Sequence, residues 1–475
     1  MSEDSSNNFE RILINENKIE QMETDEKEPS FATKEKIKYY LKGISSILAS
    51  IIHTFVYFSI WILGYTTIYL ISFRRHYDKN VDFSYSYCFI PLIHLSFSLG
   101  SPIWGVFENK FKFGGKTTIF FSSSVICTAF SIMLYSRNIY IDYILMLIIG
   151  FGMAMGYNIT KKNAYSYFMN RKALISGIIH LIANIMCFAL IFYNEIDILN
   201  YANASPVNEG IYYRKKIFMN YQELIIFELK VIIMASLGAI VLYFQNDPKE
   251  TLRLGFNEKI ENEKNDNDDN YNQIEAITKK KKKNSKKLTI KKVLKSKRTI
   301  KLMLMVFLFF PTINFVRNTM RMKPTLYFIY AVIYNVVENI SYLIFTIIGC
   351  IQFRILFVFL SALTSATSFI LIQYYDDEEF YLFLGLILVA FIISGFNIIF
   401  DKHILQVYGK ENFIEIWGII RASGGISEIF GIIFNFSLEE FSYAYKIIYF
   451  INGCFCLVSL ILGITETEEK FSCDE

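Results

Sequence analysis

Charged residues are scarce in this sequence. They make up 19% of its 475 residues, whereas about 25% is usual in soluble proteins. They also cluster at the N-terminus, between 245 and 301, and in short groups that separate apolar runs. Hydrophobic residues reach 53%, and the mean hydropathy is +0.33. This distribution excludes an ordinary soluble globule and indicates a chain that crosses a membrane several times.

Several functional signatures are also missing. The seven cysteines form no CxxC pair, and six lie in or beside apolar runs, so neither a disulfide framework nor a zinc site is expected. The first 40 residues are polar and acid-rich, so no cleavable signal peptide is expected. There is no Walker loop, HExxH motif or nucleophile elbow in a suitable context. The sequence therefore predicts neither an enzyme nor an ATP-driven pump, and no cofactor, metal or nucleic-acid partner.

Long apolar runs occur in two groups of six. The first group lies at about 43–72, 83–105, 117–136, 142–160, 173–193 and 224–244. The second lies at about 300–316, 326–349, 355–374, 380–400, 413–436 and 444–464. Helices satisfy their own backbone hydrogen bonds in lipid, and the runs are too continuous for strands of a barrel. We expect an all-α polytopic membrane protein with 12 transmembrane helices in two six-helix bundles.

The same pattern predicts the organisation of the chain. We expect an N-terminal tail at 1–42, a bundle at 43–244, a linker at 245–299, a second bundle at 300–464 and a tail at 465–475. The linker is polar, with an Asn/Asp/Glu-rich and a Lys-rich half, and its lack of apolar periodicity indicates disorder. Its lysines either contact anionic lipid or belong to a merely solvated tether.

Lysine and arginine in short loops predict the orientation, because such residues favour the cytoplasmic side. The loops between spans 2 and 3 and between spans 4 and 5, together with the linker, carry most of them: Lys110, Lys112, Lys116, Lys161, Lys162, Arg171, Lys172 and 279–283. The exceptions are Arg74, Arg75, Arg317, Arg321 and Lys323. Both termini are therefore expected in the cytoplasm, while the identity of the membrane is not determined.

A glycine-rich fourth span leads into a basic loop. It reads Gly150-Phe-Gly152-Met-Ala-Met-Gly156-Tyr-Asn158, followed by Tyr167-Phe168-Met-Asn-Arg171-Lys172-Ala-Leu174-Ile-Ser-Gly177. This segment resembles helices 4 and 5 of the monocarboxylate transporter and oxalate–formate antiporter branch of the major facilitator superfamily. Gly150 and Gly152 would allow close helix approach, and Arg171 and Lys172 would anchor the next helix. The alternative is a generic small-residue helix followed by a basic loop.

A second segment follows the second span. It reads Gly100-Ser-Pro102-Ile-Trp-Gly105-Val-Phe-Glu108-Asn109-Lys110 and resembles the superfamily's signature between helices 2 and 3. Gly105 and Lys110 match, whereas Asn109 replaces the usual aspartate and cannot form its ion pair. The resemblance implies a conformational or gating role for these residues, together with Gly150, Gly152, Arg171 and Lys172. The architecture resembles that of the superfamily over most of the chain, and the matching motifs cover about 50 residues.

Some ionisable residues fall inside predicted spans, where charge is costly and usually faces a cavity, and three of them are candidates for the site. Glu338 lies near the middle of helix 8, and Arg421 and Glu428 lie in helix 11. The resemblance implies that helices 8 and 11 line the cavity, where the planar fork of Arg421 would suit a carboxylate. Glu338 and Glu428 are candidates for proton coupling. Alternatively, Arg421 and Glu428 form an internal ion pair, or Glu338 is a satisfied packing residue.

Histidines and an outer arginine complete the candidates. His53, His94 and His180 fall in helices 1, 2 and 5, and histidine titrates near neutral pH. Among the three histidines, His53 is the preferred candidate for binding because the resemblance places helix 1 at the cavity. The alternative is that it only forms a hydrogen bond to a neighbouring helix, as membrane histidines often do. Arg317 would attract anions to an outer vestibule or would otherwise reach the membrane interface.

These observations predict a secondary active transporter that works by alternating access. The expected solute is a small organic anion such as a monocarboxylate, with protons as possible coupling ions and Arg421, Glu338, His53 and Arg317 at the binding site. An amino-acid or sugar transporter of the same fold is the first alternative. A non-transporting receptor or scaffold is the second, and it would have its charges paired in a dry core. The expected partners are the solute, protons and the lipid bilayer, with the chain as a monomer.

Overall fold

The computed structural model describes most of the chain. The described residues are 33–61, 63–81, 85, 88–111, 114–168, 171–193, 206–207, 212–213, 215–244, 290–321, 327–349, 351–374, 379–409, 412–438 and 444–466. From Gly43 onward, the helices considered below belong to one compact unit, Gly43–Gln245 together with Lys287–Glu475. Most of the predicted linker, 245–289, lies outside the described residues, so the domain bounds given above stay predictions.

The first half contains the helices of six spans. They are α2 (Thr33–Trp61) with α3 (Leu63–Tyr77), α4 (Phe89–Phe111), α5 (Gly115–Tyr135), α6 (Ile139–Tyr167), α7 (Lys172–Tyr193) and α8 (Lys215–Leu242). Between α7 and α8, β1 (Pro206–Val207) and β2 (Tyr212–Tyr213) form a short antiparallel pair. The side chain of Asn138 caps α6 by accepting a hydrogen bond from the backbone N of Tyr140.

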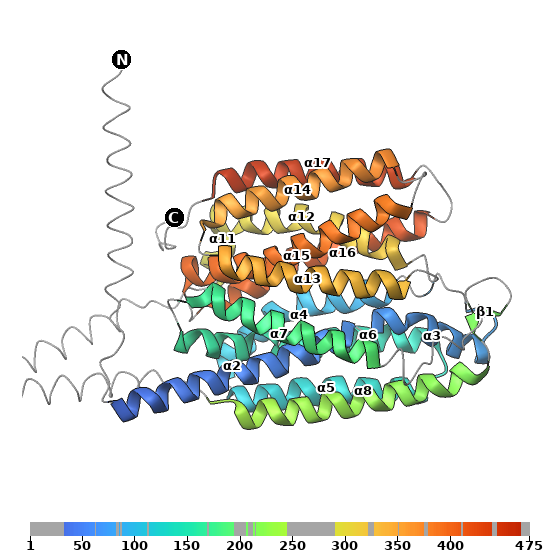
Figure 1. Cartoon of the computed structure of the whole chain (residues 1–475), viewed down its shortest axis with the longest axis horizontal. Helices are drawn as coiled ribbons and strands as arrows, with labels where there is room; N and C mark the ends of the chain where they lie inside the picture. The colour runs from blue at the N-terminus through green and yellow to red at the C-terminus, as the bar shows by residue number, and fades with distance from the viewer. Residues whose placement is uncertain are drawn as a thin grey trace, which may run out of the picture. The chain divides into compact units, whose positions relative to one another are not determined.

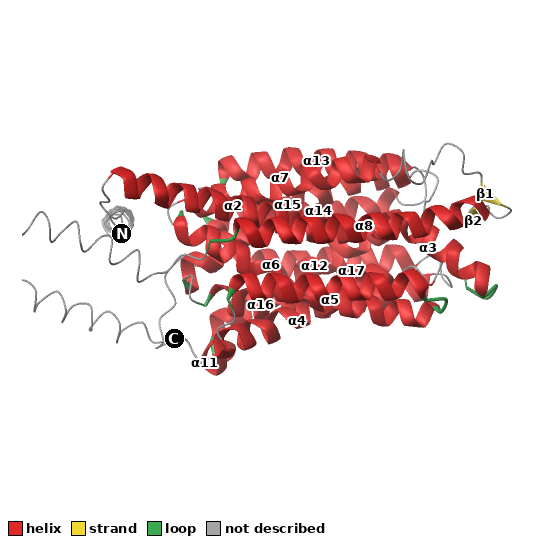
Figure 2. Ribbon diagram, turned by 90° about the horizontal axis from the view of Figure 1, so that it is seen from below, coloured by secondary structure: helices red, strands yellow, loops and turns green. Residues whose placement is uncertain are grey.

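The second half repeats the number of spans. A short helix, α11 (Ile290–Lys295), precedes α12 (Lys297–Arg321), α13 (Tyr327–Ile348), α14 (Phe353–Tyr374), α15 (Glu379–Tyr408), α16 (Phe413–Leu438) and α17 (Ala444–Ile464). Counting α2 and α3 as one span, the all-α architecture of 12 transmembrane helices is confirmed. Figure 2 shows that the described residues are almost entirely helical and that the long helices run roughly along one direction.

Length and surface both fit a lipid environment. Within the described residues, nine helices are long and apolar enough to cross a membrane. The outward faces of the helices carry large apolar side chains: Met234 and Val241 of α8 are each 70% exposed, as is Ile347 of α13. A soluble protein would bury such contiguous apolar faces, whereas lipid tails solvate them. The chain is therefore an integral membrane protein with several spans.

The two halves form separate groups of helices (Figure 1). Helices α2 to α8 lie together, and α12 to α17 lie beside them as a second group. We call the end where α8 finishes and α11 begins the linker end, and the end that carries β1 and β2 the far end. The predicted cytoplasmic location of the linker end stays a prediction.

A buried ion pair fastens the far end of the first bundle. Arg74 of α3 and Asp142 of α6 are fully buried, and Arg74 Nε lies 2.5 Å from Asp142 Oδ2. Arg74 also donates to the carbonyl oxygens of Met133 and Ser136 at the end of α5. These carbonyls have no partners within their own helix, and Arg74 supplies them. Arg74 is thus an internal structural charge, which explains why it departs from the loop-charge rule.

Aromatic rings fill the second bundle. Phe396 packs on Phe400, Phe310 and Phe309 with ring centroids 4.3, 5.0 and 5.1 Å apart, and Phe309 in turn packs on Phe357. These distances are typical of favourable aromatic pairs. The abundant phenylalanines of this sequence therefore build the core as well as the lipid-facing surface.

The chain after α17 returns to the start of α12. The buried Glu466 carboxylate lies 2.8 Å from Arg298 Nε, 2.6 Å from Lys301 Nζ and 3.4 Å from His403 Nε2 of α15. Burial by itself would raise the pKa of Glu466, but His403, Lys301 and Arg298 outweigh it and lower the pKa to about 2. This ionised carboxylate joins three helices of the second bundle at the linker end.

Candidate functional site

The two bundles touch most closely where α4 packs against α16. A side-chain carbon at Gly418 of α16 would lie 2.6 Å from the backbone N of Pro102 in α4. A carbon at Gly105 of α4 would lie 2.9 Å from the Cα atom of Glu415 in α16. Only glycine allows backbones to approach so closely. Both contacts lie near the linker end, where α4 finishes and α16 begins.

A second contact between the bundles joins α7 to α13. Gly177, near the start of α7, packs directly on the side chain of Thr346, near the end of α13. One turn further into each helix, the His180 and Tyr342 rings stack with centroids 5.4 Å apart. The two contacts together close the described part of the interface at the linker end.

A buried ion pair crosses this interface. Lys161 of α6 and Asp401 of α15 are 1% and 3% exposed, and Lys161 Nζ lies 3.7 Å from Asp401 Oδ2. Asp401 also accepts hydrogen bonds from Tyr165 at 3.0 Å, Ser176 at 3.2 Å and Trp417 Nε1 at 2.9 Å. Three of these partners belong to the first bundle. One carboxylate of the second bundle therefore gathers α6, α7 and α16 around it.

The network continues toward the middle of the bundles. Lys161 Nζ lies 2.9 Å from His180 Nε2 and 3.8 Å from the centroid of the Tyr157 ring. The Tyr157 ring packs on Trp417 of the other bundle at 5.7 Å. Charge, hydrogen bonds and aromatic faces thus meet in one layer between the halves. We call the set Lys161, Asp401, His180, Tyr165, Ser176 and Trp417 the interface network.

The centre of this network was not predicted from the sequence. Lys161 was expected in the loop between spans 4 and 5, but α6 continues to Tyr167, so Lys161 lies six residues inside the helix, roughly 9 Å from its end. Asp401 directly follows a predicted span that ends at 400, and α15 continues to Tyr408. Each residue opens a charged pair, Lys161-Lys162 and Asp401-Lys402, that follows an apolar run and is itself followed by residues that can extend the helix.

Arg421 lies one turn beyond Trp417 on α16. Its guanidinium carbon is 5.0 Å from the Phe310 centroid, 5.4 Å from Trp417 and 5.8 Å from Phe97. These distances are within the range of cation–π attraction. Arg421 is only half-buried, unlike Lys161, so it is the more accessible of these two cations. Phe97 belongs to the first bundle and Phe310 to the second, so Arg421 lies at the interface, and its role in binding stays a prediction.

The predicted acidic residues have different surroundings. Glu338 is half-buried on α13 and accepts a hydrogen bond from the hydroxyl of Tyr342 at 3.4 Å. Because Tyr342 stacks on His180, Glu338 is linked to the edge of the interface network. The side chains of Glu428 and Arg317 lie outside the described part of the structure, although α16 and α12 include their positions. Proton coupling through Glu338 or Glu428 stays a prediction.

His53 belongs to a polar group inside the first bundle. It is fully buried on α2, and its Nε2 lies 3.2 Å from the hydroxyl of Tyr57. Tyr57 lies 3.3 Å from the Ser122 hydroxyl of α5, and its ring packs on Tyr157 at 5.3 Å. His53 therefore reaches the interface network through two tyrosines and does not contact it directly.

The glycines of the fourth span lie at close contacts between helices. Gly150 packs against α4 at the carbonyl oxygen of Ile93, and a carbon at Gly152 would lie 2.8 Å from Ile126 of α5. Arg171 is exposed just before α7, and Lys172 is its first residue. These positions fit close packing and a basic helix start, while the gating role stays a prediction.

The segment between α4 and α5 is only partly described. Gly105 lies at the contact with α16 described above. Asn109 and Lys110 fall within α4, but their side chains lie outside the described part of the structure. The motif therefore runs along the helix that forms the closest contact between the bundles.

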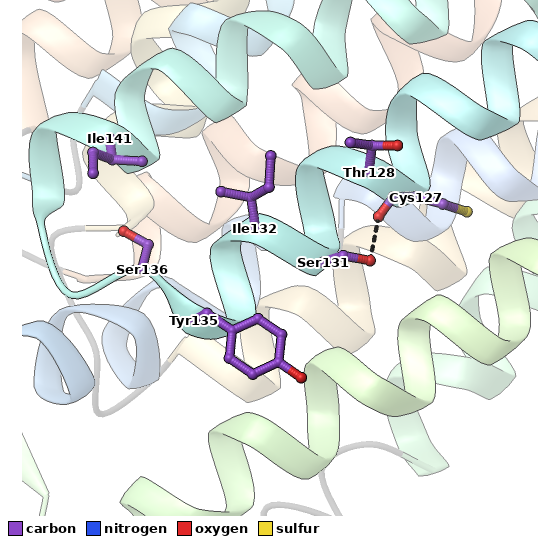
Figure 3. Close-up of a pocket in the computed structure, with 7 residues that line it drawn as sticks. All are labelled: Cys127, Thr128, Ser131, Ile132, Tyr135, Ser136 and Ile141. Atoms are coloured by element: carbon purple, nitrogen blue, oxygen red, sulfur yellow. Dashed lines mark hydrogen bonds between the residues drawn. The ribbon is translucent and has the colours of Figure 1, made fainter.

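One surface groove lies away from this interface. It is lined by Cys127, Thr128, Ser131, Ile132, Tyr135, Ser136 and Ile141 of α5 and the start of α6 (Figure 3). The Ser131 hydroxyl donates to the backbone oxygen of Cys127 in the same helix at 2.8 Å. Tyr135 is 80% exposed. The groove thus belongs to the outer surface of the first bundle and contains none of the candidate residues.

Comparisons with known proteins identify the fold. No protein-family model and no curated protein match the sequence. Solved structures do match. The major facilitator superfamily proton:xylose symporter XylE, bound to 6-bromo-6-deoxy-D-glucose, aligns with a TM-score of 0.58 at 11% identity over 89% of this chain and 94% of its own. The human organic anion transporter MFSD10 aligns with a TM-score of 0.58 at 11% identity over 90% of this chain and 99% of its own. The E. coli fucose:proton symporter FucP aligns with a TM-score of 0.58 at 12% identity over 91% of this chain and 99% of its own.

These alignments cover nearly the whole chain and nearly the whole of each neighbour. The described part of this chain therefore has the fold of the major facilitator superfamily. At 11–12% identity the similarity is one of fold alone. The neighbours include two sugar symporters and one organic anion transporter, so they do not distinguish the monocarboxylate branch from others.

Proposed function

We propose that this chain, which has the fold of major facilitator transporters, is a secondary active transporter for a small organic anion. The two bundles would rock about the central interface, so that a solute site between them opens to one side of the membrane at a time. The contacts of α4 with α16 and of α7 with α13 would then belong to the state closed at the linker end. Opening that end requires the bridge between Lys161 and Asp401 to break.

The observation that carries the proposal is the difference in burial between the two cations at the interface. Lys161 is 1% exposed and has Asp401 as its anionic partner, so its charge belongs to the contact between the bundles. Arg421 is half-buried and has aromatic faces around its guanidinium. A planar guanidinium can bind a carboxylate through two parallel hydrogen bonds. Arg421 is therefore the better candidate for holding an anionic solute.

A sugar is the second candidate solute. Tyr157 and Trp417 pack on one another across the interface, and Phe97 packs on both, at 5.4 and 6.2 Å. Apolar ring faces suit the C–H faces of a sugar. Neighbouring polar groups such as Asn397, which donates to the Tyr342 hydroxyl at 3.3 Å, could bind its hydroxyls. Two of the structural neighbours, XylE and FucP, are sugar symporters.

Uptake by proteoliposomes tests the proposal. Purified protein is reconstituted and offered a panel of labelled monocarboxylates, dicarboxylates and hexoses, with and without a pH gradient. We expect uptake of a carboxylate. Arg421→Gln should abolish that uptake, and Arg421→Lys should reduce it strongly because lysine keeps the charge but loses the planar fork. Arg354→Gln, which removes an exposed arginine of α14, is the matched control and should leave uptake unchanged.

Other outcomes separate the alternatives. Uptake of a hexose that survives in Arg421→Gln would replace the anion by a sugar. Undiminished carboxylate uptake by Arg421→Gln would remove Arg421 from the solute site and leave Glu338 and His53 as candidates. The absence of uptake of every solute, with correctly inserted protein, would favour a receptor or scaffold.

A further inference from the structure

His180 has a protonation state that its neighbours determine. Its Nδ1 lies 2.8 Å from the backbone carbonyl oxygen of Ser176, which can only accept, so Nδ1 carries a hydrogen. Its Nε2 lies 2.9 Å from Lys161 Nζ, and an ammonium group can only donate. The Tyr157 hydroxyl, 3.3 Å from Nε2, is a second donor. His180 is therefore neutral here, with Nε2 as a hydrogen-bond acceptor.

A proton on Nε2 would be incompatible with this arrangement. Nε2–H would point at the Lys161 ammonium, and two cations would face one another at 2.9 Å inside a buried interface. Like charges at this distance repel strongly, and a protonated Nε2 could no longer accept hydrogen bonds from Lys161 and Tyr157. Protonation of His180 and its contact with Lys161 therefore exclude one another.

The other elements around His180 supply further charged and titratable groups. They are Lys161 and Tyr157 from α6, Tyr342 from α13, Asp401 from α15 and Arg421 from α16. Asp401 is the anion among them, and Lys161 already lies 3.7 Å from it. A protonated His180 would compete with Lys161 for this single carboxylate. Asp401 is also the group that ties α15 to the first bundle.

We propose that His180 is the proton-binding site of the interface network and that its protonation releases the linker end. One proton adds to Nε2, Lys161 leaves His180, and the bridge between Lys161 and Asp401 is weakened. When the linker end opens, water reaches the ring and the same proton departs from Nε2. This inference rests on the proposed transporter function, because it specifies how proton movement is coupled to the opening of that site.

Trp417 provides a readout that needs no solute. Its Nε1 donates to Asp401 Oδ1 at 2.9 Å, so its fluorescence depends on the state of the network. The chain has three tryptophans, and Trp61→Phe with Trp104→Phe leaves Trp417 as the reporter. The emission spectrum is recorded for the full chain in lipid nanodiscs between about pH 8 and pH 3, a range that extends below the usual histidine range because burial and the Lys161 ammonium favour the neutral ring.

We expect one titration in this reporter chain and none in the same chain with His180→Gln. The matched control is His94→Gln, which removes a buried histidine of α4 outside the interface network and should retain the titration. Lys161→Gln should shift the midpoint to higher pH by about one unit or more, a tenfold gain in proton affinity, because a neighbouring cation is lost while Asp401 remains.

The proposal is overturned by a titration that persists in His180→Gln, by its absence from the reporter chain, or by a midpoint that Lys161→Gln leaves unchanged or lowers. If His180→Gln does not elute as a monodisperse protein, the Lys161→Gln shift alone decides the question. Loss of the titration in His53→Gln with retention in His180→Gln would transfer the site to His53. Since no solute is present, failure here leaves the uptake result standing, and failure of uptake leaves this titration standing.

Discussion

Replacing Asp401 with asparagine should release the contact between the two bundles at the linker end. Asp401 is the anionic partner of Lys161 in the described part of the structure, and it accepts hydrogen bonds at 2.9–3.2 Å from three further side chains. Removing one member of a buried ion pair costs about 3–5 kcal/mol, because the other charge is left unanswered. Every 1.4 kcal/mol is about a factor of ten, so the closed arrangement should lose roughly 10²- to 4 × 10³-fold in population.

The distance between two spin labels measures this change directly. Thr117→Cys, at the start of α5, and Arg354→Cys, at the start of α14, place one exposed label on each bundle at the linker end. We expect one distance population in the labelled parent and an additional, longer population in Asp401→Asn. The chain without the two introduced cysteines supplies the background from native cysteines.

Two further variants decide whether charge is the reason. Asp142→Asn breaks the Arg74 ion pair inside the first bundle, so it should lower the melting temperature without changing the distance between labels. Lys161→Met with Asp401→Asn should return the distance toward the parent value, because replacing both members of a buried pair is often nearly neutral. An unchanged distance in Asp401→Asn, or a double variant as open as the single one, would refute the reasoning.

Three other predictions concern stability and the linker. Because the pKa of Glu466 is lowered, its carboxylate stabilises the protein above about pH 4.5. This stabilisation, about 2–3 kcal/mol, is lost as the pH falls toward 2. Glu466→Gln should therefore lower the melting temperature at pH 7, and the melting temperature of this variant should decrease less steeply below pH 4.5. Gly418→Ala should force α4 away from α16, because the new Cβ would lie 2.6 Å from the backbone of Pro102. It should lower the melting temperature far more than the control Gly238→Ala, whose Cβ would lie 3.9 Å from its nearest neighbour. Shortening 245–289 to a flexible segment that still spans the two bundles should leave uptake intact, because the segment has no apolar periodicity with which to dock; complete loss of uptake at normal membrane abundance would contradict this.

Local composition was enough to predict the architecture. Lipid requires every span to satisfy its own backbone, so a run of about 20 apolar residues indicates a transmembrane helix without reference to its neighbours. For this reason the division into six and six spans could be predicted from the sequence. Single charges inside spans were equally visible, and Arg421 and Glu338 were selected because charge at that depth is expensive.

Only the tertiary structure decided which charges meet. Lys161 and Asp401 are 240 positions apart in the sequence, and each lies near a helix end, where a charge is unremarkable in sequence terms. Arg74 violated the loop-charge rule for a reason visible only in three dimensions, namely a buried partner on α6. His180 was ranked below His53, although His180 contacts the interface network and His53 reaches it through Tyr57 and Tyr157.

The physical reason for this division lies in the range of the interactions. Membrane insertion and helix formation depend on each segment and its solvent, and the sequence states both directly. The pairing of charges depends on which helix faces are brought together by close contacts such as those of Gly105 and Gly418, and those contacts form between segments far apart in the chain. The sequence by itself thus determined the twelve spans and their chemistry, and the fold determined that Lys161, Asp401 and His180 act on one another.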